Sequence, residues 1–136
     1  MSDDQLRTIL TTTKRIALVG ASNKPSRPSY EVMAFLLDQG FDVIPVNPGL
    51  SGQEILGRRV VASLDEAAPL DMVELFRRAS EVAAPVADAI RLGARTIWMQ
   101  LGVVNEDAAQ AARAAGLNVV MDRCPAIDMP RLGLMR

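Results

Sequence analysis

The chain contains no histidine and only one cysteine, Cys124, among its 136 residues. The absence of histidine excludes Cys/His and multi-histidine zinc sites, and it also excludes Ser-His-Asp and Cys-His catalysis. A single cysteine cannot form a disulfide within the chain. We therefore expect no metal site and no complete catalytic apparatus.

Long hydrophobic runs are also missing. No stretch approaches the roughly 20 apolar residues that span a bilayer. The first ten residues carry two aspartates and lack the apolar segment of a signal peptide. The net charge of −1 provides no overall field that would attract nucleic acid or an anionic membrane. We expect a cytoplasmic protein that binds a small molecule, and neither nucleic acid nor a membrane.

What the sequence does contain is typical of a soluble globular domain. Hydrophobic residues make up 49% of the chain and charged residues 23%. A chain of this length fits one domain of ordinary size. We therefore expect a single domain over residues 1–136.

Short apolar runs alternate with longer amphipathic segments, which is typical of a parallel sheet covered by helices. The predicted strands are 16–19, 42–46, 72–76, 96–101 and 119–121, with a short edge strand at 59–62. The predicted helices are 3–12, 29–39, 85–92 and a segment between Asn105 and Gly116, with a helical turn at 63–68. We interpret 47–57 as a loop and the two-proline tail from Pro125 as a segment that wraps an edge. The predicted fold is α/β, a single doubly wound Rossmann-like domain with a mainly parallel sheet of five to six strands.

Such sheets bind ligands at the carboxyl ends of their strands. The first predicted strand is followed by Gly20, Ala21, Ser22, Lys24 and Arg27, and no acidic residue occurs between Asp4 and Glu31. A glycine turn before a helix presents N–H groups to an anion, while the hydroxyl and the two cations add hydrogen bonds and charge. This loop predicts a phosphate site, and the alternative is an ordinary solvated loop.

The same loop is not the dinucleotide fingerprint, because Ser22 and Pro25 occupy positions where GxGxxG requires glycine. At the end of the second strand an NAD site usually has an acidic residue, whereas this chain has Asn47. Asn47 can hydrogen-bond a ribose or a base without repelling a nearby phosphate. Asn47 and Pro48 are also compatible with simple turn chemistry.

Two further strand ends carry candidate binding residues. Phe76 could stack on an adenine or pack in the core, and Arg77 could face the ligand or the solvent. On the next strand Trp98 and Gln100 share one face by alternation, and a buried Gln100 needs a hydrogen-bond partner. Gly102 would allow a ligand to approach the backbone closely.

Cys124 follows the last predicted strand and is compatible with two roles. Arg123 beside it could favour a reactive thiolate. The alternative is a buried structural cysteine.

Together these motifs resemble the small stand-alone CoA-binding domain family, which is similar to the N-terminal domain of the succinyl-CoA synthetase alpha subunit. The resemblance covers about residues 5–134. The motifs that carry it are Val19-Gly20-Ala21-Ser22, Lys24, Ser26-Arg27-Pro28-Ser29-Tyr30, Val46-Asn47-Pro48, Leu75-Phe76-Arg77-Arg78, Trp98-Met99-Gln100-Leu101-Gly102 and Asp122-Arg123-Cys124-Pro125.

The resemblance implies that coenzyme A is the bound cofactor. It implies that the loop from Gly20 through Ala21 to Arg27 holds the phosphates. It implies that Val46, Asn47 and Pro48 border the adenosine. It further implies that Phe76, Arg77, Gln100 and Gly102 line the path of the adenine and the pantetheine arm. The synthetase's phosphorylated histidine has no counterpart here. The tail also departs from the family pattern at Ala126 and Asp128-Met129.

We therefore expect a module that binds coenzyme A or an acyl-CoA at the carboxyl ends of the strands. One alternative is an NAD(H)-binding oxidoreductase or redox sensor. A further alternative is an enzyme that uses Cys124 as its nucleophile.

Overall fold

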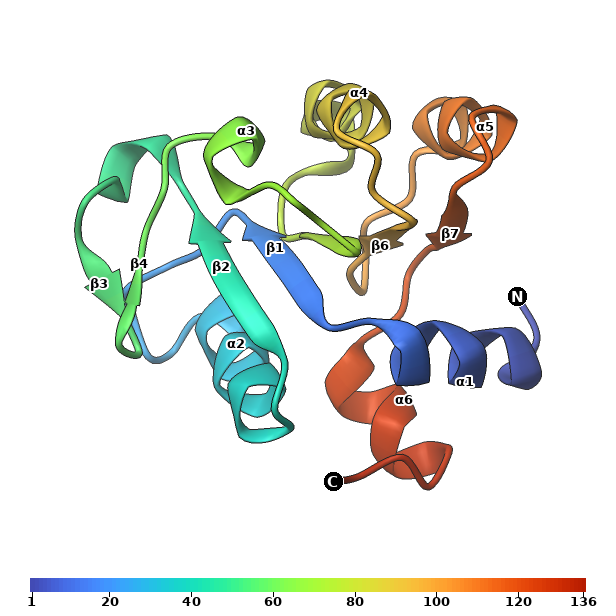
Figure 1. Ribbon diagram of the computed structural model, residues 1–136, viewed down its shortest axis with the longest axis horizontal. Coiled ribbons are helices and arrows are strands. Elements are labelled where there is room, and N and C mark those ends of the chain that lie inside the picture. The colour runs from blue at the N-terminus through green and yellow to red at the C-terminus, as the bar shows by residue number, and fades with distance from the viewer.

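Five parallel strands form the central sheet, in the order β2-β1-β5-β6-β7 (Figure 1). The computed structural model describes residues 1–136. All four pairs of neighbouring strands are parallel. The strands are β1 (Arg15–Val19), β2 (Asp42–Val46), β5 (Met72–Leu75), β6 (Thr96–Met99) and β7 (Asn118–Val120). The predicted doubly wound, Rossmann-like α/β fold is confirmed, with five strands in its main sheet.

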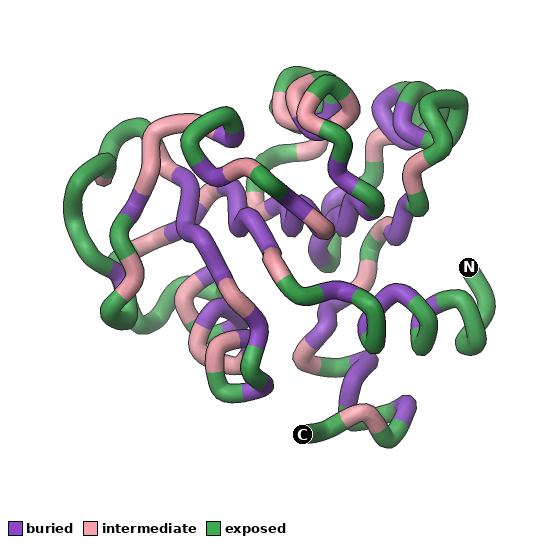
Figure 2. Tube along the Cα trace, in the orientation of Figure 1, coloured by how far each residue is buried: buried purple, intermediate pink, exposed green.

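Helices cover both faces of the sheet, so each face has its own buried core (Figure 1). One face is covered by α1 (Asp3–Thr12), α2 (Pro28–Asp38) and α6 (Pro125–Arg131). The other face is covered by α3 (Leu64–Ala67), α4 (Ala83–Arg91) and α5 (Glu106–Ala114). The strands are buried along most of their length, whereas the helices alternate buried and exposed positions (Figure 2). None of the helices has the length and apolar character needed to cross a membrane.

The direction of winding reverses between β1 and β5. From β1 the chain crosses to β2 at one edge, and it then returns to β5 and continues outward through β6 to β7. The loops that leave β1 and β5 therefore diverge, which opens a crevice between their carboxyl ends. This crevice is the place at which the fold itself favours ligand binding.

The segment predicted as a loop at 47–57 contains more structure than expected. It includes a short 3-10 helix, η1 (Pro48–Leu50), and the first strand of a small hairpin formed by β3 (Glu54–Ile55) and β4 (Arg58–Arg59). Of the predicted edge strand at 59–62, Arg59 ends β4 and Val61 forms a single parallel bridge with Val46. Two-residue strands are too short to show alternation, which explains why the sequence did not predict them.

The tail beyond Pro125 is a helix, so the prediction of an edge-wrapping segment was wrong. Pro125 occupies the first position of α6, where a missing N–H costs nothing. Pro130 lies one residue before the helix ends and removes only one backbone hydrogen bond. The start of α4 was also predicted wrongly, at Pro85. The helix begins at Ala83, after η2 (Ala79–Glu81).

A glutamate lies fully buried in the central strand. Glu74 has no exposed surface, and neither of its carboxyl oxygens receives a hydrogen bond. Its neighbours across the sheet are Leu18 and Trp98. Burial raises the pKa of Glu74 well above its ordinary value of 4.5, and the nearby Cys124 raises it further. An ionised carboxylate without partners is strongly disfavoured here, so Glu74 holds its proton in the folded protein.

This elevated pKa predicts how stability depends on pH. The folded chain binds the Glu74 proton more tightly than the unfolded chain does. The free energy of unfolding should therefore fall as the pH rises above about 4.5 toward the folded-state pKa. Glu74→Gln removes this titration, so the melting temperature of the variant relative to wild type should increase with pH between 5 and 9. Thermal melts across this range test the prediction, with the exposed Glu106→Gln as the control. Parallel pH profiles for wild type and Glu74→Gln would contradict it.

Candidate functional site

A cleft of about 660 Å³ lies at the carboxyl ends of β1, β5 and β6. It is formed by the loop after β1, the start of α2, the turn after β2 and the loops after β5 and β6. Its fifteen lining residues are Gly20, Ala21, Ser22, Lys24, Arg27, Pro28, Ser29, Asn47, Gly49, Leu50, Phe76, Arg77, Gln100, Leu101 and Val103. The structure thus brings together nine of the twelve residues that the sequence predicted, and it leaves Val46, Pro48 and Gly102 outside this cleft.

The floor of the cleft depends on the absence of a side chain at Gly20. Its φ is +86°, and a Cβ there would lie 2.1 Å from the carbonyl oxygen of Phe76. No other residue can occupy this position without displacing the backbone after β5. Gly20 therefore allows the ends of β1 and β5 to approach closely and sets the path of the loop that follows.

This loop presents donors that no protein atom uses. The N–H groups of Ser22 and Asn23 make no hydrogen bond within the protein, and neither does the N–H of Ser29 in the first turn of α2. The hydroxyl oxygen of Ser22 accepts a bond from the N–H of Lys24 at 3.1 Å, which leaves the hydroxyl proton free to donate. Because α2 begins here without a side-chain cap, the positive end of its dipole also faces the cleft. These groups suit an anion such as phosphate.

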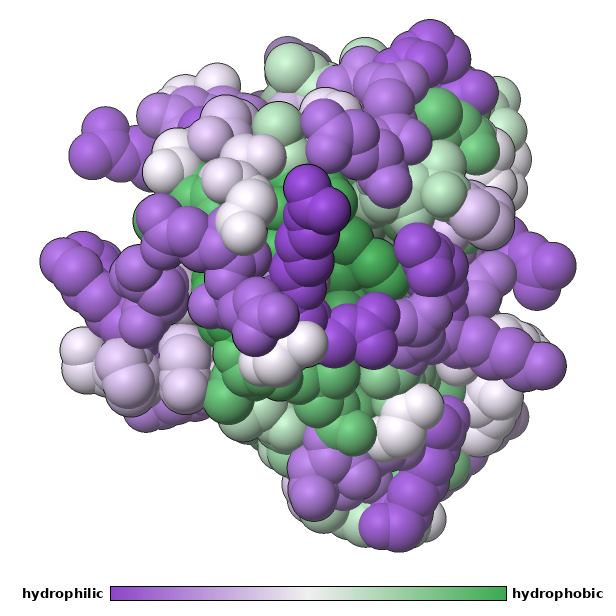
Figure 3. Space-filling view, turned by 60° about the vertical axis from the view of Figure 1, so that its left-hand side comes forward, coloured by the Kyte–Doolittle hydropathy of each residue, from purple (hydrophilic) through white to green (hydrophobic).

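The charges of the cleft have one sign. Lys24 and Arg27 form no ion pair, and no carboxylate lines the cleft. Arg77 pairs with Glu81, whose carboxyl oxygen lies 3.2 Å from the guanidinium nitrogen. On the side of the β3–β4 hairpin, hydrophilic side chains surround an area of hydrophobic surface (Figure 3). Two unpaired cations at the start of a helix give the cleft a local positive field in a protein whose net charge is −1.

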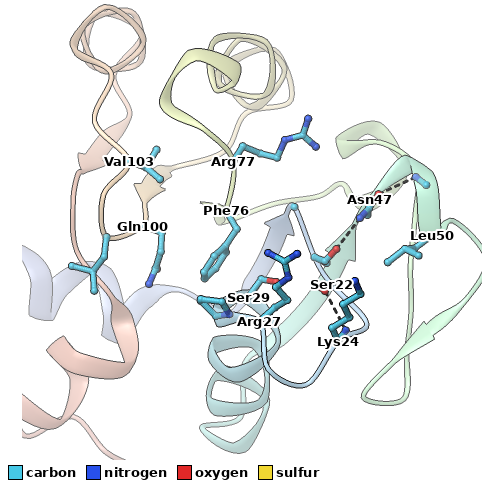
Figure 4. A pocket seen from close by; sticks show the side chains of 15 residues that line it. Ser22, Lys24, Arg27, Ser29, Asn47, Leu50, Phe76, Arg77, Gln100 and Val103 are labelled. Carbon is cyan, nitrogen blue, oxygen red and sulfur yellow. Dashed lines mark hydrogen bonds between the residues drawn. The ribbon is translucent and has the colours of Figure 1, made fainter.

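Asn47 has a structural role at the edge of the cleft. Its amide nitrogen donates to the carbonyl oxygen of Ala21 at 2.8 Å, and its amide oxygen accepts from the N–H of Gly49 at 2.9 Å (Figure 4). These bonds tie the loop after β1 to the turn after β2. One N–H of the amide remains available to a ligand.

A second, smaller hollow of about 250 Å³ lies next to the cleft. Val46 and Pro48 line it together with residues of α3 and α4, so these two predicted residues face the hollow instead of the main cleft. Arg77 borders both spaces.

At the β6 end the cleft becomes less polar. Phe76 and Gln100 point to the same side of the sheet, whereas Arg77 points away from them (Figure 4). Gln100 is only 7% exposed, and its Oε1 is buried without a donor. Leu101 and Val103 complete this end. Trp98, which we predicted to share a face with Gln100, lies in the core beneath α1, α2 and α6. Its indole N–H donates to the carbonyl of Arg123 at 2.8 Å.

Gly102 and Cys124 do not line the cleft. Gly102 has φ +81° in the turn after β6, and its N–H donates to Asp122 at 2.7 Å. Cys124 is 7% exposed and packs in the core beneath α1, α2 and α6. The structure therefore favours the structural interpretation of Cys124 over a nucleophile facing the ligand.

Six lining residues were not among the predicted binding residues: Pro28, Ser29, Gly49, Leu50, Leu101 and Val103. Pro28 and Ser29 could have been found, because proline at the first position of a helix marks the start of α2 and hence its anion-binding end. The others contact the cleft through loop conformations that no local pattern encodes.

The close approach at Gly20 gives a direct test. Gly20→Ala should destabilise the fold more than Gly52→Ala. Both glycines have φ near +86°, but a Cβ at Gly52 meets nothing within 4 Å. The left-handed conformation alone should cost Gly52→Ala about 1–2 kcal/mol, and the clash should make Gly20→Ala at least about 2 kcal/mol worse. Urea denaturation measures both variants, and equal losses would show that the contact with Phe76 relaxes freely.

Comparison with solved structures supports the architecture. A Pyrococcus horikoshii protein is 41% identical with a TM-score of 0.92, covering 97% of this chain and 92% of that one. A Thermus thermophilus protein is 38% identical with a TM-score of 0.91, covering 97% and 99% of the two chains. The acetyl-coenzyme A synthetase 1 of Candidatus Korarchaeum cryptofilum, solved with phosphate and ADP, shares the fold at 23% identity and a TM-score of 0.70. It covers 89% of this chain and 28% of its own.

The sequence comparisons agree. The YneT protein of Bacillus subtilis is 39% identical over 124 residues, which is 90% of each chain. The family described as CoA binding domain matches residues 14–130. With most of its length matched, this chain belongs to the CoA binding domain family.

Proposed function

We propose that this protein binds coenzyme A, or an acyl-CoA, in the cleft at the carboxyl ends of its strands. The observation that carries the proposal is the pair of cations Lys24 and Arg27, which stand without carboxylate partners beside the unused N–H groups of the loop after Gly20. Such a group of donors suits the phosphates of the ligand. Membership in the CoA binding domain family supports the same choice.

The shape of the site suits the remaining parts of coenzyme A. The second hollow, where Val46 and Pro48 lie beside polar residues such as Glu81, offers a space of mixed character for the adenine. Asn47 stands between the two spaces with one N–H left for the ribose or base. The pantetheine arm then runs along Phe76 toward Gln100. Neighbouring strands are about 4.8 Å apart, so β6 lies about 10 Å from β1, a span that an extended arm can cover.

The proposed activity is binding without chemistry. The cleft is lined by no carboxylate, thiol or phenol, so the only titratable side chains that face the ligand are cations. General acid–base catalysis needs a group that exchanges a proton near neutral pH. Glu74 is the one carboxyl group whose pKa is raised, and it lies wholly beneath the surface. The chain therefore holds the ligand and offers no base to activate it.

Isothermal titration calorimetry tests the identity of the ligand. Coenzyme A should bind more tightly than NAD, because Asn47 stands where an NAD site usually has an acidic residue for the ribose hydroxyls. Coenzyme A should also bind more tightly than 3′-dephospho-CoA, because Lys24 and Arg27 gain an additional phosphate partner. Affinity for NAD equal to or above that for coenzyme A would refute the proposal and support the dinucleotide alternative.

The unpaired cations give a second test. Arg27→Ala should weaken coenzyme A binding by about 1.5–3 kcal/mol, the usual range for a hydrogen bond to a charged group. The melting temperature should change little, because Arg27 is exposed and its side chain makes no capping hydrogen bond to α2. Arg113→Ala, which removes an exposed and unpaired arginine on α5, is the matched control. If neither Arg27→Ala nor Lys24→Ala changes the affinity, the phosphates bind elsewhere.

A further inference from the structure

Gln100 at the β6 end of the cleft and Glu74, buried within β5, carry polar groups that the proposed phosphate site does not use. Three acceptor atoms there are buried without a donor, namely both carboxyl oxygens of Glu74 and Oε1 of Gln100. Buried polar atoms are nearly always paired in folded proteins. Three such atoms in one region therefore call for a physical explanation.

The two residues are diagonal neighbours on one face of the sheet. Glu74 lies directly across from Trp98, and Gln100 follows two positions after Trp98 on the next strand. The ladder continues to this point, because the backbone N–H of Gln100 donates to the carbonyl of Leu75 at 3.3 Å. With strands about 4.8 Å apart and a rise of about 3.3 Å per residue, the two Cα atoms are about 8 Å apart. Two extended side chains of this length can meet across that distance.

A proton on the Glu74 carboxyl group is enough to pair one of its oxygens with Gln100 Oε1. Burial keeps Glu74 protonated, so its carboxyl group is a donor as well as an acceptor. No donor in the structure forms a hydrogen bond with Gln100 Oε1. If the Glu74 proton is donated to this oxygen, the amide of Gln100 is held with its nitrogen on the opposite side.

That nitrogen faces the ligand space. The NH2 group of Gln100 donates to no protein atom, and Gln100 lines the cleft (Figure 4). The surroundings at this end are Phe76, Leu101 and Val103, with no cation among them. An uncharged donor in apolar surroundings matches an uncharged acceptor, because an anion here would lose its hydration without gaining a counter-charge.

We propose that the Gln100 amide donates to a neutral carbonyl oxygen in the flexible arm of the ligand, and that Glu74 positions this amide by donating its carboxyl proton to Gln100 Oε1. The inference rests on the proposed function and specifies which ligands the cleft prefers. The cations at the β1 end bind the phosphates, and the amide at the β6 end recognises an amide or thioester carbonyl. Gln100 is then the residue that distinguishes a ligand with an acylated or amide-bearing arm from a bare adenine nucleotide.

Calorimetry with two probes separates the two ends of the site. Coenzyme A carries the phosphates and the arm, whereas adenosine 3′,5′-bisphosphate carries phosphates and adenosine without the arm. Gln100→Leu should weaken coenzyme A binding about tenfold, the upper range for one neutral hydrogen bond, and should leave the affinity for the bisphosphate unchanged. Gln110→Leu makes the same change at an exposed position of α5 and should alter neither affinity.

The role of Glu74 is tested by a matched pair of substitutions. Glu74→Leu keeps the volume but removes the donor behind Gln100, so it should weaken coenzyme A binding about threefold and spare the bisphosphate. Glu74→Gln retains an N–H donor at the same place and should restore the affinity of the wild-type protein. A residue that only supported the fold would affect both probes alike, so thermal melts and the bisphosphate affinity together report any general damage.

The outcomes distinguish this inference from the proposed function. Loss of affinity for coenzyme A alone in Gln100→Leu, with rescue in Glu74→Gln, supports the inference. If Gln100→Leu changes neither probe or weakens both equally, the inference is wrong while coenzyme A binding stands. If Glu74→Leu behaves like wild type, Gln100 acts without Glu74. If the wild-type protein fails to bind coenzyme A, the proposed function and the inference both fail.

Discussion

The geometry of the site depends on the contact between Gly20 and the carbonyl of Phe76. At this switch point the two central strands end side by side, and the carbonyl occupies the space that a Cβ would need. The loop after β1 must therefore turn across the end of β5 before it enters α2. That path directs the N–H groups of the loop and the start of α2 into one space. A single missing side chain thus gives the end of a parallel sheet a cleft lined by free N–H groups and cations.

The two cations of the cleft are free of carboxylate partners. Several arginines elsewhere are paired with carboxylates, as Arg15 is with Asp42 and Arg91 with Asp65 at 2.7 and 2.8 Å, although Arg113 on α5 is not. Lys24 and Arg27 have no such partner. Exposed ion pairs contribute little to stability, so leaving two cations unpaired costs the fold little. Charge-assisted hydrogen bonds to a phosphate are stronger than such exposed pairs, so the same two charges would gain more in the proposed complex.

The sequence predicted the parts of the structure that follow from periodicity and from the general rule for parallel sheets. Apolar runs located all five main strands, and the rule that ligands bind at strand ends predicted one site containing Gly20, Arg27, Phe76 and Gln100. The sequence-based prediction failed where the structural role of a residue depends on its exact position in a helix or turn. Prolines in the tail indicated an irregular segment, although Pro125 begins a helix. Gly102 has a positive φ because the turn after β6 requires it, and Asp122 uses its N–H.

Glu74 shows why the chemistry of the site could not be predicted from pattern alone. In the sequence it is one acidic residue in the run Met72–Leu75, and nothing marks it as fully buried. Trp98, its neighbour across the sheet, has its polar atom paired with a backbone carbonyl, whereas both oxygens of Glu74 are left without a donor. A hydrophobic residue of the same volume would fill this position at lower cost. An arrangement that reduces stability is expected where a protein binds a ligand. A protonated Glu74, diagonal to Gln100 on the same face of the sheet, would offset that cost by orienting the Gln100 amide in the proposed complex.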